Sequence, residues 1–196
     1  MLTFSTSLLK LGEMMRNSLN YCSNCGAKLS FDFVEGENRK RYFCTNCGTI
    51  HYTNPKIIVG AVVYWEDKVL LCKRAIEPRL GFWNTPGGFL EDEEKAEDGA
   101  AREVLEESGG EVEIERVIDI YNLPHANQVY IHFLARLKDG KFSNGVESIE
   151  SKLFTENEIP WKDMAFTSSM FALRKYFADR KEGCQKAYLG SFPQIK

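Results

Sequence analysis

The chain has 196 residues, of which 43% are hydrophobic, and its formal net charge at pH 7 is −3. This composition can bury a sizeable core and excludes a wholly disordered chain, while the slightly acidic balance excludes a protein held to nucleic acid by bulk positive charge. No run of apolar residues approaches the roughly 18 to 20 that a membrane-spanning helix needs.

Residues 1–20 are expected to form a flexible leader. Their short apolar pieces are interrupted by Lys10, Glu13 and Arg16, so they lack the continuous apolar stretch of a secretory signal. The acidic residue and the single arginine also disfavour a transit peptide. We therefore expect a cytoplasmic protein.

Residues 21–54 contain an internal repeat of cysteine pairs. Cys22-Ser-Asn-Cys25-Gly returns as Cys44-Thr-Asn-Cys47-Gly, with 18 residues between the pairs. This spacing is typical of a zinc ribbon, in which four thiolates complete a tetrahedral and therefore structural Zn²⁺ site. The alternative is two disulfides or metal-free thiols, which the absence of any sign of an oxidising compartment disfavours. Two short strands are expected between the pairs.

A turn signal at Asn54-Pro55 separates the ribbon from the next domain, which we assign to residues 55–180. Two β-rich runs, residues 57–65 and 68–74, predict a hairpin because only two polar residues separate them. The glycine-rich residues 81–88 follow and are expected to form a loop or a strand end.

Residues 91–107 carry nine acidic and two basic side chains. A solvated acidic helix would be the simplest explanation. The apolar residues nevertheless follow the helical spacing i, i+3, i+4, i+7, which predicts one packed face formed by Ala101, Val104, Leu105 and Ser108.

Glu103, Glu106 and Glu107 fall together on another face of this helix. At about 6 Å and an effective dielectric constant of about 20, each pair of their carboxylates repels by roughly 3 kcal/mol, so a compensating cation is expected. Carboxylate oxygens without thiols or histidines suit Mg²⁺ or Mn²⁺, which in turn suggest a phosphate substrate.

The same segment resembles the Nudix box, Gx5Ex7REUxEExGU. Gly88 is followed after five residues by Glu94, and after seven more by Arg102-Glu-Val-Leu-Glu-Glu-Ser-Gly109. Every fixed letter is present, and only the last apolar position differs, because Gly110 occupies it. The resemblance implies an α+β protein with the Nudix fold, a mixed β-sheet between helices, preceded here by a small zinc-ribbon module.

The resemblance also implies the ligands of the catalytic Mg²⁺ or Mn²⁺. These are Glu103, Glu106 and Glu107, with the backbone carbonyl of Gly87 or Gly88 as a further ligand.

Four box residues are expected to brace the site rather than to react. Glu94 and Arg102 would pair, and Gly88 and Gly109 would shape the loops at either end of the helix. The competing interpretation makes Arg102 a phosphate binder.

The carboxylate that takes the proton of the attacking water varies among Nudix enzymes. Glu106 and Glu107 are candidates. Glu147, with Glu150, resembles the family's second acidic cluster outside the box, so Glu147 is a further metal ligand or the base. The alternative is a solvent-facing strand end.

Nudix enzymes cleave a nucleoside diphosphate linked to another group, by attack of water at phosphorus. A zinc ribbon before a Nudix domain resembles the NADH pyrophosphatase branch, but the SQPWPFPxS-like segment of that branch is absent. Residues 123–125 and 128–130 (Leu-Pro-His and Gln-Val-Tyr) instead resemble the plant plastid FAD pyrophosphatase and its bacterial relatives. We therefore predict hydrolysis of FAD to AMP and FMN, with NADH and ADP-ribose as alternatives.

The expected partner is accordingly a small dinucleotide-type molecule, and no membrane partner is expected. Nucleic acid enters as an alternative in two forms: an NAD-capped RNA cleaved by the same chemistry, or a non-catalytic module that binds nucleic acid or senses a ligand. A three-residue basic cluster at residues 39–41 is a small footprint for nucleic acid.

Substrate contacts are expected from flat apolar side chains and cations near the box. The candidates are Trp83, Phe82, Arg74, Tyr121 and His125. Burial in the core is the alternative for each aromatic residue, and solvation for the arginine.

The last part of the chain predicts an amphipathic helix at residues 169–180, explained by core packing or by a homodimer contact. Residues 181–196 are expected to be a polar tail. Cys72 is expected to be a buried thiol and His132 a structural residue of a strand.

Overall fold

The computed structural model describes residues 19–192 of the chain. These residues form two compact units, one ending at Pro55 and the other beginning at Lys56. The leader expected at residues 1–20 lies outside the described residues except for its last two. In the part of the chain that the structure describes, no helix is long and apolar enough to cross a membrane.

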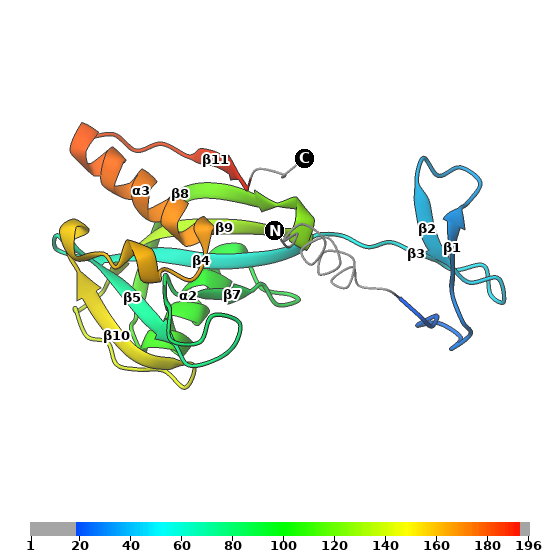
Figure 1. Cartoon of the computed structure of the whole chain (residues 1–196), viewed down its shortest axis with the longest axis horizontal. Helices are drawn as coiled ribbons and strands as arrows, with labels where there is room; N and C mark the ends of the chain where they lie inside the picture. The colour runs from blue at the N-terminus through cyan, green and yellow to red at the C-terminus, as the bar shows by residue number, and fades with distance from the viewer. Residues whose placement is uncertain (1–18, 193–196) are drawn as a thin grey trace, which may run out of the picture. The chain divides into compact units, whose positions relative to one another are not determined.

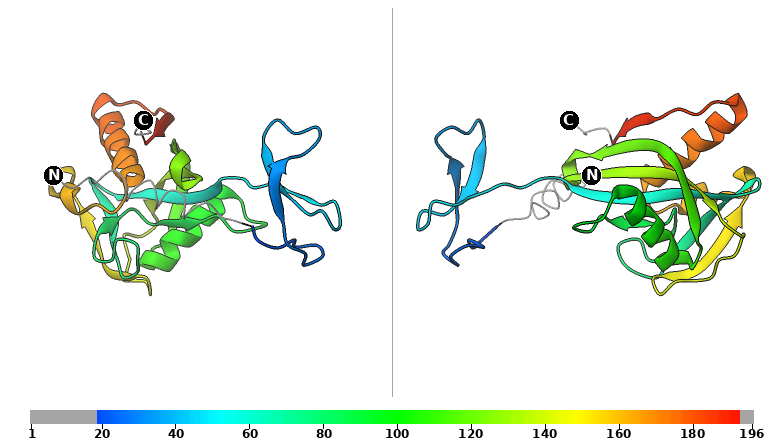
Figure 2. Two further views of the ribbon diagram at one scale, coloured as in Figure 1. Left: turned by 45° about the vertical axis from the view of Figure 1, so that its right-hand side comes forward. Right: turned by 180° about the vertical axis from the view of Figure 1, so that it is seen from behind.

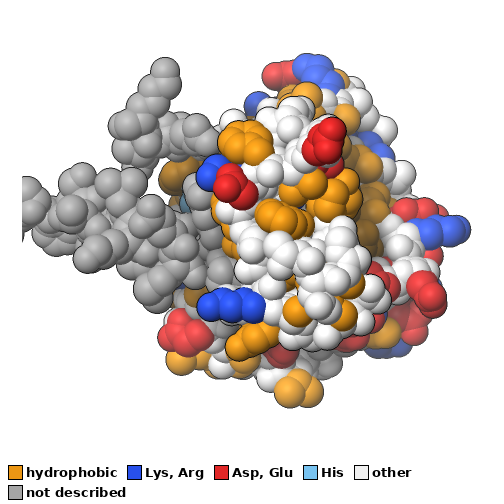
Figure 3. All heavy atoms as spheres, turned by 90° about the vertical axis from the view of Figure 1, so that its right-hand side faces the viewer, with side chains coloured by type: hydrophobic (Ala, Val, Ile, Leu, Met, Phe, Trp, Pro, Cys, Tyr) orange, Lys and Arg blue, Asp and Glu red, His pale blue; other side chains and the backbone are white. Residues whose placement is uncertain are grey.

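The first unit is a three-stranded antiparallel sheet, drawn in blue in Figure 1: β1 (Ser30–Phe33), β2 (Lys40–Phe43) and β3 (Ile50–His51). The hairpin of β1 and β2 is the one expected between the cysteine pairs. Phe31 and Phe33 stay exposed, and Figure 3 likewise shows hydrophobic side chains at the surface between charged ones. Because so small a unit has little apolar core, its folding needs another source of free energy.

The second unit carries the remaining elements of the described chain. Its strands are β4 (Lys56–Trp65), β5 (Lys68–Arg74), β6 (Trp83–Asn84), β7 (Gly87–Phe89), β8 (Val112–Leu123), β9 (Gln128–Leu137), β10 (Ser148–Phe154) and β11 (Tyr188–Ser191). Its helices are α2 (Ala96–Ser108), α3 (Thr167–Glu182) and the 3-10 helices η1 (Pro124–Ala126), η2 (Glu156–Glu158) and η3 (Trp161–Asp163). Figures 1 and 2 show α2 and α3 on opposite sides of the strands.

The large mixed sheet has the order β10-β5-β4-β9-β8-β11. The predicted hairpin is formed by β4 and β5, with Val63 opposite Leu70. The first half of β4 pairs instead with β7, with Val59 opposite Gly88, while β9 runs parallel to β4 along its other edge. Strands β5 and β7 therefore diverge from the same edge of β4.

Two glycines allow β4 and β7 to approach each other closely. A Cβ atom on Gly60 would lie 2.8 Å from the Pro86 carbonyl oxygen, and one on Gly87 would lie 2.7 Å from the Val59 carbonyl oxygen. These contacts are with backbone atoms, so rearranging side chains would not relieve them.

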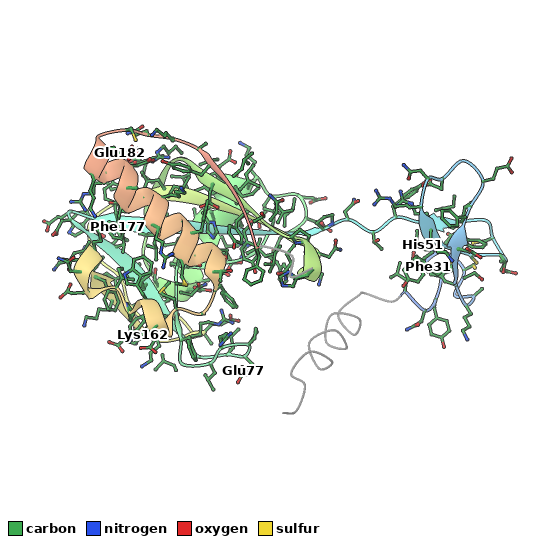
Figure 4. The ribbon with its side chains drawn as sticks, turned by 45° about the horizontal axis from the view of Figure 1, so that its top comes forward. Phe31, His51, Glu77, Lys162, Phe177 and Glu182 are labelled. Atoms are coloured by element: carbon green, nitrogen blue, oxygen red, sulfur yellow. The ribbon has the colours of Figure 1, made fainter. Side chains whose placement is uncertain are left out.

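The core lies on both faces of the sheet because side chains of β9 alternate between them. Leu134 packs with Leu173 and Phe177 of α3, whereas Phe133 packs with Ala100 of α2. Figure 4 labels Phe177 on α3.

The helix predicted at residues 169–180 is therefore α3, and core packing accounts for its apolar side. Leu173, Tyr176 and Phe177 are all buried within the chain. Core packing is therefore the alternative that the burial of these side chains supports, and the homodimer contact stays a prediction.

The packed face of α2 differs from the expected one. The buried residues are Gly99, Ala100, Val104 and Ser108, whereas Leu105 is 50% exposed. The prediction that Leu105 packs inward was wrong. Leu105 follows the buried Val104, and one residue corresponds to a rotation of about 100° around the helix. Ala100 packs with Val59 and Phe133 of the sheet, whereas Gly99 lies against Glu94 and Leu90 of the segment before the helix.

The expected tail at residues 181–196 also differs from the structure. It contains β11, which pairs in parallel with β8 through Tyr188 opposite Asp119. Asp179 anchors this segment, because its carboxylate accepts hydrogen bonds from the Tyr188 hydroxyl and the Lys186 amide and pairs with Arg116 at 2.9 Å. The sequence between Asp179 and β11 is polar, which is why the sequence predicted a tail.

Two buried side chains are as expected. Cys72 is a buried thiol in β5, and burial raises its pKa to about 12. His132 is buried in β9, with its Nδ1 atom 2.9 Å from the Asp119 carboxylate.

Candidate metal-binding and active sites

The four cysteines of the repeat come together in the first unit. Their Sγ atoms all lie within 4.8 Å of one another, and the Cys22–Cys47 and Cys25–Cys44 separations are 3.7 and 3.5 Å. Four sulfurs around one Zn²⁺ at about 2.3 Å are about 3.8 Å apart in a tetrahedron. The geometry fits a zinc ion, and disulfides are absent from the four described thiols.

Polar groups beside the sulfurs explain why the repeat includes more than cysteine. The Asn24 side-chain amide donates to Cys47 Sγ at 3.8 Å, and the Asn46 amide donates to Cys25 Sγ at 3.7 Å. Each asparagine therefore supports a sulfur of the other pair. Such donors stabilise the thiolate form that a metal requires.

His51, labelled in Figure 4, lies on β3 of the same unit. Its Nε2 atom is 3.3 Å from Cys22 Sγ. The histidine contacts a sulfur and adds no fifth ligand, because four thiolates already close the coordination sphere.

In the second unit, the glycine-rich segment forms β6 and β7, and Gly88 lies directly above the carboxylate of Glu103. A Cβ atom at residue 88 would come within 2.5 Å of Glu103 Oε1. The absence of a side chain at Gly88 therefore makes room for this carboxylate.

Arg102 is the central cation of the box. Its guanidinium binds both carboxylate oxygens of Glu94, at 2.7 and 3.1 Å, and also Glu103 at 2.8 Å and Glu106 at 3.2 Å. A further hydrogen bond to the Phe89 carbonyl ties α2 to β7. Part of the expected repulsion on this helix is thus balanced by an arginine of the protein itself.

Glu107 lacks such a partner. Burial raises its pKa to about 8, the nearby charges of Glu103 and Glu147 act in the same direction, and only Arg74 and a backbone hydrogen bond with Gly87 act against them. Burial likewise raises the pKa of Glu103. Burial and neighbouring carboxylates therefore disfavour the charged form of both groups in the protein alone, so a bound cation would stabilise that form. Their oxygen atoms are the type of donor that Mg²⁺ or Mn²⁺ prefers.

The other two acidic candidates are more open. The Glu106 side chain is 58% exposed and is bound to Arg102. Glu147 precedes β10, and its backbone carbonyl accepts a hydrogen bond from Ala75. Among the described residues, the four cysteines alone bring three or more potential ligands within 4.8 Å, so the glutamates are not drawn together to that extent.

Two glycines follow the C-terminal end of α2. Gly109 ends the helix in the left-handed conformation, with φ of 60°, and its N–H donates to the Leu105 carbonyl. Gly110, the position that departs from the box, packs on Leu137, which a Cβ atom would approach to 2.9 Å.

Two of the predicted substrate contacts lie in the core instead. Trp83 is 9% exposed and packs edge-on against Phe154, with ring centroids 4.9 Å apart. Tyr121 is buried against Phe171. The alternative of burial was correct for these residues, because both strands turn the aromatic side chain toward α3 or its flanking loops.

The other three candidates are better placed. The Arg74 guanidinium lies 5.1 Å from the ring of Phe166, Arg79 lies over Phe82 at 5.5 Å, and His125 lies beside Phe192. Glu77, labelled in Figure 4, marks the loop between β5 and β6 that carries Arg79.

His125 belongs to a cleft of about 210 Å³, which we call the Phe166 cleft. It is lined by Arg79, Leu123, His125, Tyr130, Ala165, Phe166, Thr167, Ser168 and Phe192. Residues 165–168 and Phe192 were not among the predicted substrate contacts. The run of small hydroxyl residues at the start of α3 could have indicated residues 165–168. No sequence signal indicated Phe192.

The fold and these sites together define a class of protein, an α+β domain with a mixed sheet between two helices and a four-cysteine ribbon before it. The NUDIX domain family matches residues 54–173, and the Nudix N-terminal zinc-ribbon family matches residues 20–53. The chain belongs to the Nudix family.

Several relatives are similar over large parts of the chain. A crystal structure of a NUDIX hydrolase from Nitrosomonas europaea has a TM-score of 0.86 and 47% sequence identity, and the match covers 89% of this chain and 99% of that one. An ADP-ribose pyrophosphatase from Methanocaldococcus jannaschii is 28% identical over 56% of this chain and 67% of its own length. The NAD-capped RNA hydrolase NudC from Vibrio parahaemolyticus is 32% identical over 74% of this chain. The match spans 55% of the NudC relative, so the chain corresponds to about half of that protein.

Proposed function

We propose that this chain hydrolyses the diphosphate bond of a nucleoside diphosphate linked to another group, with an ADP-containing molecule as substrate. The observation that carries the proposal is the position of Glu103 and Glu107 within a complete Nudix box, where burial and neighbouring carboxylates disfavour their charged form. A divalent cation would stabilise two such carboxylates.

Glu103 and Glu107 would hold Mg²⁺ or Mn²⁺, with Glu106 and the Gly87 carbonyl as further ligands. The metal, when bound, polarises the phosphorus–oxygen bonds and lowers the pKa of water. Arg102 orients Glu103 and Glu106 through the hydrogen bonds described above. Glu94 in turn fixes the plane of the guanidinium.

Glu147 is our candidate for the group that takes the proton from the attacking water. Among the described residues it forms no ion pair, unlike Glu106, and it lies close enough for its charge to raise the pKa of both Glu103 and Glu107. An unpaired carboxylate accepts a proton more readily than one bound to arginine. Glu147→Gln should therefore lower kcat by roughly 100-fold or more, the range of general base catalysis, and Glu106→Gln should lower it less.

The candidate substrates share an ADP half. The relatives are named for ADP-ribose and NAD-capped RNA, and residues 123–130 support the prediction of FAD. All three molecules contain adenosine diphosphate, so a site that holds this half accepts each of them.

The experiment is a substrate panel of FAD, NADH, NAD⁺, ADP-ribose and an NAD-capped RNA, with Mg²⁺ or Mn²⁺ and separation of products by chromatography. We expect AMP from at least one small dinucleotide and none in EDTA. Metal-independent cleavage, or cleavage of no member of the panel, would overturn the proposal. Cleavage of ADP-ribose without FAD would reject FAD alone.

A further inference from the structure

The Phe166 cleft lies in the second unit and combines aromatic walls with a few polar groups. Tyr130, Phe166, Phe192 and the His125 ring provide flat surfaces, and Arg79, Thr167 and Ser168 provide polar atoms. This mixture is typical of a site for a planar polar ring.

The size of the cleft limits its occupant. Its volume of about 210 Å³ is below the roughly 300 to 1,000 Å³ of pockets that enclose a whole drug-sized ligand. The cleft therefore accommodates one part of a dinucleotide, and the remainder must lie outside it.

Ser168 is the unusual residue of the cleft wall. It is 3% exposed, and its hydroxyl has no hydrogen-bond partner in the described structure. Its neighbour Ser169 is also buried but is fully engaged, since it accepts from Thr85 at 2.9 Å and donates to Asn84 at 2.6 Å.

A buried hydroxyl without a partner destabilises a folded protein, because it has lost its hydrogen bonds with water. Ser168 lines the cleft while its hydroxyl oxygen is buried, so the side chain has to turn toward the cleft to form a hydrogen bond with a ligand there. The three staggered rotamers of serine allow the hydroxyl to turn toward such a ligand.

Arg74 connects the cleft with the box. Its guanidinium lies over the Phe166 ring at 5.1 Å, and its positive charge acts on both Glu107 and Tyr130. A nucleotide whose base occupied the cleft would therefore have its phosphates near a cation, on the side of the acidic residues.

We propose that the Phe166 cleft binds the purine base of the substrate, with Phe166 and Phe192 stacking on the ring and Ser168 reading its polar edge. Ser168 is thus a specificity-determining residue. The inference rests on the proposed function for the identity of the nucleotide, but base binding is measurable without hydrolysis.

The test uses AMP and ribose 5-phosphate, which share a phosphate and a ribose and differ in the base. Calorimetric titration of the full chain in EDTA should give at least tenfold tighter binding of AMP. Ser168→Ala should weaken AMP binding by roughly 2- to 10-fold, as expected for one neutral hydrogen bond, and leave ribose 5-phosphate unchanged. Phe192→Ala should weaken AMP binding by roughly 5- to 100-fold through lost stacking.

Ser169→Ala is the matched control. Its hydroxyl is satisfied within the protein, so this variant should lower Tm, whereas Ser168→Ala should keep Tm or raise it. Equal affinity for AMP and ribose 5-phosphate, or unchanged AMP affinity in both Ser168→Ala and Phe192→Ala, would overturn the inference.

The outcomes also separate this inference from the proposed function. Base-dependent AMP binding by a protein that hydrolyses no dinucleotide would reject the function and keep the cleft. Hydrolysis with unchanged kcat/KM in both cleft variants would keep the function and reject the cleft.

Discussion

The two units arrange their proposed metal ligands in opposite ways. In the ribbon, four sulfurs already lie at tetrahedral separations, and asparagine amides support them from outside. In the box, Arg102 binds Glu94, Glu103 and Glu106 and holds them in fixed directions, while Glu107 has no ion pair among the described residues.

This difference corresponds to what each site has to do. A structural site is closed, so nothing but the protein binds the ion. A catalytic site keeps positions open for water and phosphate, so its ligands stay further apart, and the protein alone does not supply all the positive charge that their ionised form needs.

The largest effect is expected for Cys44→Ser. Zinc binding contributes roughly 10 to 16 kcal/mol to the folding of small zinc modules, so losing a ligand should unfold the ribbon. Metal analysis should show loss of about one zinc per chain, and limited proteolysis should cut within residues 20–53. Cys184→Ser, a thiol outside both sites, should keep the zinc. Retained zinc in Cys44→Ser would contradict the assignment.

Glu107→Gln should lower kcat by roughly 100-fold or more, because a metal ligand supports several kcal/mol of transition-state stabilisation. The fold should survive, since the change replaces a buried acid whose pKa is raised to about 8. Steady-state kinetics and thermal melting measure both effects, and Glu97→Gln, on the exposed side of α2, is the control. Full activity in Glu107→Gln would remove this helix from the mechanism.

Arg102→Lys should lower kcat/KM by roughly tenfold, because lysine cannot reproduce the two-point contact with Glu94 and also reach Glu103. If Arg102 is a brace, Glu94→Gln should have a similar effect, and the double variant should be no worse than either single one. Additive losses would instead favour Arg102 as a direct phosphate binder.

The smallest effect concerns pH. Glu107 has a pKa of about 8 in the folded protein against a reference value of 4.5, so its contribution to stability is present below about pH 4.5 and is lost as pH rises through 8. A divalent ion restores it. The thermal shift caused by Mn²⁺ should therefore be larger at pH 8 than at pH 6, and Glu107→Gln should remove the difference. A shift independent of pH in the unmodified protein would argue against Glu107 as a ligand.

The sequence allowed the ribbon, the β4–β5 hairpin, the box helix and α3 to be predicted, because each rests on local spacing. The predictions failed for residues whose burial depends on partners far away in the sequence. Trp83 and Tyr121 have the chemistry of stacking residues, but the sheet turns them into the core.

The C-terminal strand is a similar case. Nothing near residues 188–191 indicates a strand, because β11 depends on Asp179, on Arg116 and on the free edge of β8. Ser168 could not be predicted for a different reason. An unsatisfied hydroxyl is recognisable only when the positions of all its neighbours are known.

The glycines at the β4–β7 contact also bear on the history of the protein. Gly60 and Gly87 each face backbone atoms, whereas Gly88 faces only the tip of the Glu103 side chain. In a mutant library selected for folding alone, residues 60 and 87 should remain invariant while 88 drifts. Adding selection for turnover should fix residue 88 as well, so the two glycine classes would record two separate kinds of evolutionary pressure.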